Sequence, residues 1–219
     1  MRPEARLDFS RLYVFGAGGH GREIAWLAER AWREIPEIVF LVDDSKHLKS
    51  PVDGYPVRLL EDEELASDSR VVVAVGDPKS RRGIANAFEE RGVRAATIVD
   101  PTVTRSGRIS IGDGAVVFPG CVLTTDVTLG RHVHVNVGCT VSHDSRVGDF
   151  SSISPGVHIA GNVRIGETVF VGVGANIING LTGAPLVVGD RAVIAAGACV
   201  IGPVDAGSMV AGVPAVKKR

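Results

Sequence analysis

The sequence predicts a chain of two parts, a small parallel α/β sheet followed by a parallel β-helix. Short apolar runs alternate with helical segments before residue 100, and an aliphatic residue recurs at every sixth position from Ile111 onward. Composition changes at the same point, because both tryptophans and both tyrosines precede residue 56 and only three phenylalanines follow Pro101. We therefore expect one domain at residues 1–100 and a second at 101–219.

Alternating apolar runs and helical periods define the first domain. Apolar residues bounded by glycine or aspartate predict buried strands, and apolar residues at helical spacing predict helices that cross between them. Strand–helix alternation implies a parallel sheet with right-handed crossovers. About four strands fit, which is one mononucleotide-binding half of a Rossmann-like fold. The expected strands are 12–15, 38–42, 71–75 and 96–99, and the expected helices are 21–34 and 80–90.

The stretch VFGAGGHGRE joins the first expected strand to the first expected helix and contains Gly16-x-Gly18-x-x-Gly21. That spacing is the dinucleotide-binding fingerprint. Backbone N–H groups at a helix start suit a phosphate, and an acidic residue about 20 positions later suits a ribose hydroxyl. Ligands bind at the carboxyl ends of parallel strands, which here carry the glycine loop, Asp43-Asp44 and Gly76. These ends favour a nucleotide-type ligand.

Three alternatives remain open at these strand ends. Glycines at a strand-to-helix turn also serve tight packing alone. Asp43 and Asp44 are equally compatible with solvated loop carboxylates, and His20 with an exposed loop residue.

The hexad repeat defines the second domain. Stacked short strands that turn a corner every six residues close one coil in three faces and bury a prism of aliphatic side chains. Twelve hexads would make four coils. The phase breaks at Asn179–Pro185, which we expect to be a loop outside the prism, and one more coil follows. A purely structural prism is the alternative. The hexad residues are Ile111, Val117, Leu123, Leu129, Val135, Val141, Val147, Ile153, Ile159, Ile165, Val171 and Ile177, then Val188, Ile194 and Val200.

His143 and Asp144 are the third and fourth residues of one hexad, so they occupy a corner outside the aliphatic interior. A histidine beside a carboxylate can act as a general base, because the anion favours the imidazolium formed on proton abstraction. Adjacency does not show whether Asp144 contacts the ring. Other histidines compete for the role: His132 at a corner, His134 and His158 pointing outward, and His47 in a charged loop; each alone is more often a surface histidine.

Several function classes are disfavoured. The formal net charge of −1 gives no electrostatic case for nucleic acid or an anionic membrane. The odd set of cysteines lacks CxxC spacing, so we expect no disulfide framework and no metal, with Cys121 and Cys139 in the core. A charged Met1–Ser10 and the lack of an apolar run of roughly 18 to 20 residues predict a cytoplasmic protein.

Three features together carry a resemblance: VFGAGGHG with LVDD and VAVG, the hexapeptide prism, and SHDSRVGDFSSISPGVHIAGNVRIG followed by AGVPA. The chain resembles bacterial acetyltransferases that modify nucleotide-linked amino sugars or sialic acid. It is most similar to those acting on UDP-4-amino-4,6-dideoxy sugars and GDP-perosamine. The resemblance covers nearly the whole chain and implies a left-handed β-helix, acetyl-CoA as co-substrate and a homotrimer with CoA between adjacent prisms.

The resemblance also implies roles for single residues. The catalytic base falls on His143, its acidic partner, often Glu, on Asp144, and the oxyanion-stabilising N–H on Gly161. Cofactor-binding positions fall on Asn136, Ser152, Gly161, Val173 and Ala196, although some relatives carry histidine at Ser152. Nucleotide-sugar positions fall on Gly18, Gly19, His20, Asp43, Asp44 and Gly76. The basic end, Lys217, Lys218 and Arg219, either meets a CoA phosphate or is solvated.

The function expected from the resemblance is direct N-acetylation of a UDP- or GDP-linked amino-deoxy sugar by acetyl-CoA. Two alternatives stay open at this point. The same base suits a hydroxyl acceptor, as in O-acetylation of sialic acid or another sugar. The glycine loop alone also suits a nucleotide- or NAD-binding scaffold without transferase activity.

Overall fold

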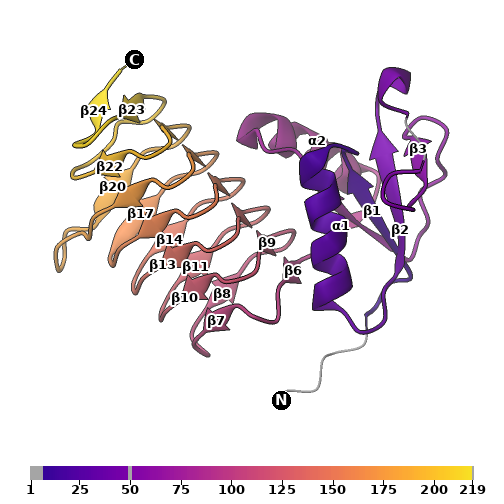
Figure 1. Cartoon of the computed structure of the whole chain (residues 1–219), viewed down its shortest axis with the longest axis horizontal. Coiled ribbons are helices and arrows are strands. Elements are labelled where there is room, and N and C mark those ends of the chain that lie inside the picture. Colours follow the sequence, from indigo (N-terminus) through magenta and orange to yellow (C-terminus); the bar gives the residue numbers. More distant parts are fainter. Residues whose placement is uncertain (1–6, 49–50, 219) are drawn as a thin grey trace. The chain divides into compact units, whose positions relative to one another are not determined.

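A computed structural model describes residues 7–48 and 51–218 (Figure 1). The chain forms two compact units. The first extends to Gly76 and includes Gly83–Ala96, and the second combines Asp77–Arg82 with the chain from Thr97 onward. Within the described residues no helix is long and apolar enough to cross a membrane.

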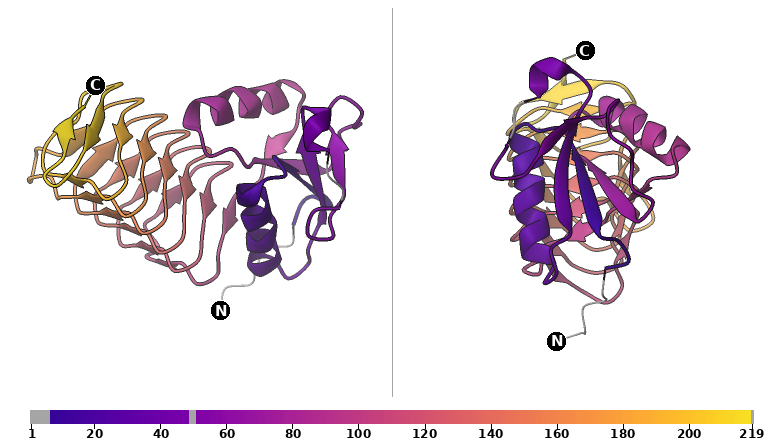
Figure 2. Two further views of the ribbon diagram at one scale, coloured as in Figure 1. Left: turned by 45° about the horizontal axis from the view of Figure 1, so that its top comes forward. Right: turned by 90° about the vertical axis from the view of Figure 1, so that its right-hand side faces the viewer.

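The first unit is a parallel sheet of five strands in the order β3-β2-β1-β4-β5. Helix α1 (Gly19–Ala31) follows β1, the single turn η1 (Ser45–His47) follows β2, and helix α2 (Pro78–Glu90) lies between β4 and β5. The central strands are buried on both faces, as expected where helices flank a parallel sheet (Figure 2). The strands are β1 Arg11–Phe15, β2 Glu37–Val42, β3 Val57–Leu59, β4 Ser69–Val73 and β5 Arg94–Ala95.

Two sequence expectations for this sheet are wrong. The sheet has five strands rather than about four, because the short β3 pairs with β2 from Phe40↔Val57 onward. Its three residues, with Arg58 at the centre, lack the apolar run of a buried strand. The single strand expected at 96–99 is instead two: β5 pairs with β4, whereas Ile98–Val99 (β6) pairs with β9 of the second unit.

The second unit is a left-handed parallel β-helix with three faces. Up to the loop at Asn179–Pro185 each coil takes 18 residues, so a residue pairs in register with the one 18 positions later, as His134↔Ser152, Thr140↔His158 and Arg146↔Arg164 show. The loop lengthens the next coil, where Phe170 pairs with Val193. We call the three sheets faces A, B and C and name each corner by the two faces it joins. The A–B corner thus follows β12, and the B–C corner follows β13.

Face A contains β6 Ile98–Val99, β9 Val116–Val117, β12 His134–Val135, β15 Ser152–Ile153, β18 Phe170–Val171, β21 Val193–Ile194, β23 Met209–Ala211 and the antiparallel β24 Val216–Lys217. Face B contains β7 Thr104–Arg105, β10 Val122–Leu123, β13 Thr140–Val141, β16 His158–Ile159, β19 Asn176–Ile177 and β22 Cys199–Val200. Face C contains β8 Ser110–Ile111, β11 Thr128–Leu129, β14 Arg146–Val147, β17 Val163–Ile165 and β20 Leu186–Val188.

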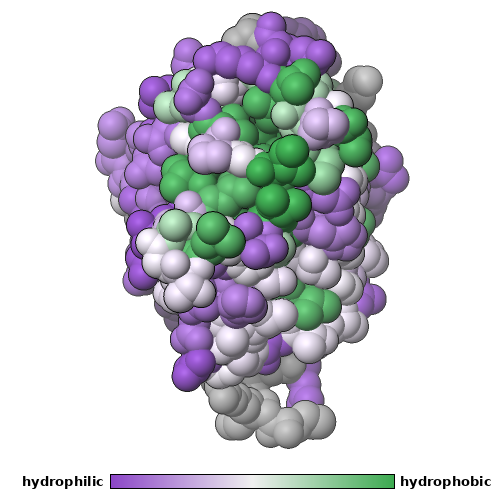
Figure 3. All heavy atoms as spheres, turned by 90° about the vertical axis from the view of Figure 1, so that its left-hand side faces the viewer, coloured by the Kyte–Doolittle hydropathy of each residue, from purple (hydrophilic) through white to green (hydrophobic). Residues whose placement is uncertain are grey.

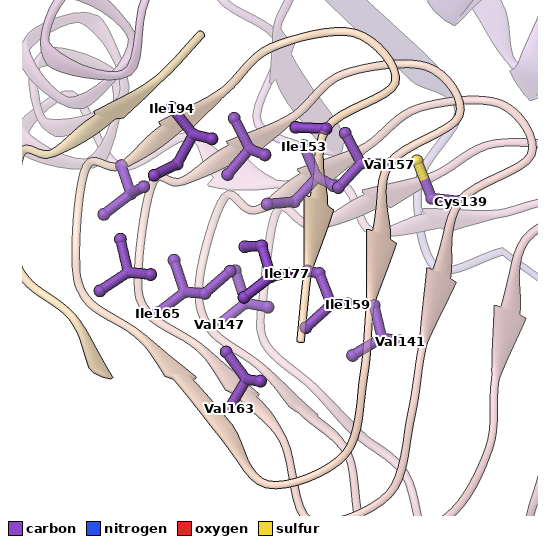
Figure 4. Close-up of a cluster of buried hydrophobic side chains, with 14 of the residues drawn as sticks. Cys139, Val141, Val147, Ile153, Val157, Ile159, Val163, Ile165, Ile177 and Ile194 are labelled. Atoms are coloured by element: carbon purple, nitrogen blue, oxygen red, sulfur yellow. The ribbon is translucent and has the colours of Figure 1, made fainter. Parts of the chain in front are cut away.

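The hexad residues fill the interior of the prism. From Val117 to Val200 every one of them is buried, and their side chains meet along the axis (Figure 4). Cys121 and Cys139 also face inward without exposure, which confirms their prediction as core residues. The β-helix starts earlier than the aliphatic repeat, because β6 and β7 form faces A and B of a preceding coil. Arg105 occupies the hexad position there, so the aliphatic pattern does not reveal that coil.

Candidate active site

His143 and Asp144 lie together at the B–C corner, between β13 and β14. Both side chains are exposed, and His143 Nδ1 lies 2.8 Å from Asp144 Oδ2. Asp144 has a φ of 59°, a left-handed backbone conformation that aspartate tolerates better than most residues. Because an ionised carboxylate only accepts hydrogen bonds, a neutral imidazole in this contact has its proton on Nδ1 and its lone pair on Nε2. In that form Nε2 can accept a proton.

Gly161 lies one coil further along at the same corner. The N–H of its neighbour Asn162 donates to the His143 carbonyl at 2.8 Å. A Cβ on Gly161 would lie 2.4 Å from His143 Nε2, so the absence of a side chain is what lets the ring sit there. Within the described chain the Gly161 N–H donates to no acceptor. An N–H group and a basic ring nitrogen thus adjoin the same small space, as proton abstraction with oxyanion stabilisation requires.

A groove of about 640 Å³ opens over this corner. One side of the groove is formed by the loop at Asn179–Pro185, which the sequence predicted to leave the prism and in which Leu181 is 71% exposed. Asn162 Nδ2 donates to the Leu181 carbonyl and ties that loop to the corner. The groove is lined by Asp126, His143, Asp144, Arg146, Gly161, Asn162, Arg164, Asn179, Gly180, Thr182 and Gly183.

Most of the predicted cofactor residues lie at a different corner. Asn136, Val173 and Ala196 follow strands of face A and stack at the A–B corner, where the Gly197 N–H donates to the Val173 carbonyl. Val173 is 56% exposed, whereas Ser152 lies on the outward side of β15 and is buried. Face B separates this corner from His143 within one chain. Of the predicted cofactor set, only Gly161 adjoins the candidate base.

The glycines of the first unit divide into two kinds. Gly21 serves close packing, because a Cβ there would lie 1.9 Å from the Gly16 carbonyl oxygen, and Gly16 has a φ of 107°. Gly18, Gly19 and Gly76 instead border open space, with no atom within 4 Å of an added Cβ. Gly18 caps α1 and Gly19 is its first residue, so free space lies where a helix N-terminus attracts an anion.

The polar residues predicted beside that loop have distinct surroundings. His20 Nδ1 lies 3.1 Å from Glu23 Oε2 on the first turn of α1. Asp43 lines a small cavity of about 130 Å³ with Phe15, Phe88 and Arg91 among its walls.

Asp44 caps the turn η1. Its carboxylate accepts from the Lys46 N–H at 3.0 Å and pairs with the Lys46 ammonium, which together hold the pKa of Asp44 below its usual value. That carboxylate stabilises its own loop, in keeping with the alternative that Asp44 is a solvated loop carboxylate.

Two competing histidines are not surface residues, so that expectation is wrong. His132 and His134 are buried, and the His132 ring stacks on Phe150 with ring centres 4.8 Å apart. His158 is exposed and shares a 2.9 Å hydrogen bond with Thr140. Over residues 7–48 and 51–218, no group of three or more His, Cys, Asp or Glu is arranged to hold a metal.

Comparison with solved structures identifies the family. The acetyltransferase domain of PglB from Neisseria gonorrhoeae is 36% identical to the chain, with a TM-score of 0.87, and the match covers 95% of this chain and 100% of that one. The chain belongs to the nucleotide-amino-sugar acetyltransferase family. The family model of the PglD N-terminal domain matches residues 11–88, the region that contains the glycine loop.

Two further solved structures extend the comparison. WeeI from Acinetobacter baumannii is 28% identical, with a TM-score of 0.89 over 94% of this chain and 99% of that one. PerB from Caulobacter crescentus, solved with CoA and GDP-perosamine, is 26% identical, with a TM-score of 0.82 over 98% and 100%. No curated protein sequence matches the chain.

Proposed function

We propose that the protein is an acetyl-CoA-dependent N-acetyltransferase that acts on the amino group of a UDP- or GDP-linked amino-deoxy sugar. The observation that carries this proposal is the B–C corner, where Nδ1 of the exposed His143 is held by Asp144 and Nε2 lies against Gly161. Relatives support the substrates: a PglB acetyltransferase domain was solved with acetyl-CoA, and PerB with CoA and GDP-perosamine.

The geometry suits direct transfer without an acylated residue. His143 Nε2 accepts a proton from the neutral sugar amine as the amine nitrogen bonds to the thioester carbon. The carbonyl π electrons move to oxygen, where the Gly161 N–H stabilises the negative charge. Collapse of the tetrahedral adduct breaks the C–S bond, and the proton held on His143 leaves with CoA as its thiol. The products are the N-acetyl sugar nucleotide and CoA.

We assign the nucleotide part of the substrate to domain 1–100 and the acyl transfer to domain 101–219. Open space at Gly18, Gly19 and Gly76, next to the start of α1, supports this division. Asp43 and His20 adjoin the same strand ends and complete the proposed site. For the basic end of the chain, a contact with a CoA phosphate and a solvated tail both stay open. Lys217 Nζ pairs with Asp205 at 2.9 Å, and Arg219 lies outside the described residues.

We propose that the protein is a homotrimer, and the separation of the two corners supports an assembly of more than one copy. Because face B lies between His143 and the predicted cofactor residues, a site that uses both sets requires the A–B corner of a second copy. Exposed apolar side chains on face A and the A–B corner, Phe170, Val137 and Val173, suit burial against such a copy. Apolar side chains also gather at the C-terminal end of the prism (Figure 3). We place CoA in this interface.

We propose the cytoplasm as the location. The three cysteines are free thiols, although Cys121 and Cys139 occupy stacked positions one coil apart. Free thiols are typical of a reducing compartment.

A panel of acceptors tests the proposed function. The protein is incubated with acetyl-CoA and with UDP-, GDP- and dTDP-linked amino sugars, and release of CoA thiol is followed; we expect turnover with a UDP- or GDP-linked amine. Sialic acid and other sugars with free hydroxyl groups are assayed in parallel as acceptors. Turnover restricted to one of these would establish the O-acetylation alternative. If no acceptor releases CoA thiol and the purified protein retains NAD, the scaffold alternative would be established.

A further inference from the structure

Two arginines form an unpaired ladder on face C. Arg146 of β14 and Arg164 of β17 pair in register, and because Val147 and Ile165 point into the core, both guanidinium groups point outward. Neighbouring strands lie about 4.8 Å apart, so two positive side chains stand one above the other. Within the described chain neither makes an ion pair or a side-chain hydrogen bond. Like charges opposite each other on adjacent strands destabilise a sheet.

Nearby carboxylates are already engaged. Asp126, in the same groove, pairs with Arg108, and Asp144 holds the His143 ring. Both arginines nevertheless line the groove together with His143 and Gly161. Two stacked guanidinium groups beside a reaction centre, with their charge uncompensated by the chain, fit an anionic ligand. Phosphate is well matched, because the planar guanidinium binds its oxygens in a bidentate manner.

The distance from His143 to the two arginines decides whether they can contact the sugar-linked phosphate or a CoA phosphate. Arg146 follows His143 by three residues, so their Cα atoms lie at most about 10 Å apart. In a nucleotide-linked amino sugar only the pyranose ring separates the reacting amine from the sugar-linked phosphate. In acetyl-CoA the whole pantetheine arm separates the thioester from the diphosphate. A ligand whose reacting atom lies at His143 Nε2 therefore brings the sugar-linked phosphate, rather than a CoA phosphate, within reach of this ladder.

We propose that Arg146 and Arg164 bind the sugar-linked phosphate of the nucleotide-sugar substrate and so place its amine at His143. This assignment rests on the proposed function. It gives the prism domain a substrate-binding role in addition to its catalytic one.

Steady-state kinetics of Arg146→Gln, Arg164→Gln and the double variant test the assignment with GDP-perosamine and a UDP-4-amino-4,6-dideoxy sugar. Loss of one charge-assisted contact raises KM for the sugar nucleotide at least about tenfold, and loss of both about 100-fold. KM for acetyl-CoA and kcat stay within about threefold of wild type. Arg191→Gln is the matched control, because Arg191 is exposed on the same prism but does not line the groove.

Binding of inorganic pyrophosphate, measured by calorimetry, separates this proposal from the proposed function. We expect the double variant to bind pyrophosphate at least about tenfold more weakly than wild type, whether or not the panel shows acetyl transfer. If pyrophosphate binding depends on the two arginines but no acceptor is acetylated, the proposed function would be wrong and the anion site at Arg146 and Arg164 would be kept. A rise in KM for acetyl-CoA alone would assign the ladder to CoA and overturn the proposal. Unchanged sugar KM, or pyrophosphate binding that is absent or equal in both proteins, would do the same.

Discussion

At the scale of single residues, the candidate chemistry depends on one stacked pair. The ring of His143 occupies the space that a side chain at position 161 would fill. Its other nitrogen lies 2.8 Å from Asp144 Oδ2, and Asp144 has the same left-handed backbone as Asp126 and Asn162 at this corner. Base, orienting carboxylate and N–H donor thus come from two successive coils of one corner.

Replacement of the base tests this corner directly. For His143→Ala we expect kcat/KM to fall about 10²-fold or more, because general-base catalysis is lost while the fold is unchanged. His158→Ala is the matched control, since His158 is also an exposed histidine of the prism but lies outside the groove. A near-normal rate for the His143 variant, with circular dichroism as in wild type, would remove His143 from the role.

Gly161→Ala tests the contact between the two coils. The added methyl would lie 2.4 Å from Nε2, so the imidazole must move away from its present position. We expect kcat to fall at least about tenfold, because catalytic groups tolerate little displacement, with little change in melting temperature. Gly107→Ala, whose added Cβ meets no atom within 4 Å, should retain wild-type kcat. Equal activity of the two variants would contradict the proposed role of position 161.

At the scale of elements, the start of α2 is fastened to the prism by a buried arginine. Arg81 has no solvent exposure, and its guanidinium donates to the carbonyls of His132, Phe150 and Ser151. Burial lowers the pKa of this group to about 10. Those carbonyls come from two successive coils at the C–A corner, so one side chain joins the helix start to the β-helix.

Arg81→Met should therefore destabilise the fold. Several buried carbonyls lose their donor at once, and we expect the free energy of unfolding to fall by about 3 kcal/mol in urea titrations. The adjacent Arg82 pairs with the exposed Glu167, so Arg82→Met should cost less than about 1 kcal/mol. Similar losses for the two variants would show that the buried contacts contribute no more than the exposed ion pair.

At the scale of the whole molecule, the two groups of predicted site residues belong to different corners of one prism. His143 and Gly161 lie at the B–C corner, and Val173 and Ala196 at the A–B corner. A complete site under the proposed function therefore needs two copies. Exposed apolar residues beside the A–B corner favour the same conclusion.

Complementation tests this arrangement. His143→Ala and Ala196→Trp should each be inactive, the first for lack of a base and the second because the indole blocks the cofactor corner. When equal amounts are co-expressed, random assortment in trimers restores both intact corners at roughly one interface in four. We expect about that share of wild-type activity in the mixture, with trimer mass by light scattering. Failure of the mixture to exceed its components would indicate that each site lies within one chain.

The sequence by itself determined the architecture, the hexad core and the corner position of His143, because burial in a prism repeats every six residues and marks each inward side chain. Only the tertiary structure decided which residues meet. The His143–Gly161 contact and the Arg146–Arg164 ladder join residues 18 positions apart, and their geometry depends on how successive coils stack. Likewise, the six-residue period does not encode the burial of His132 and His134. It predicted the loop at Asn179–Pro185, but only the structure shows that residues of this loop line the groove beside His143.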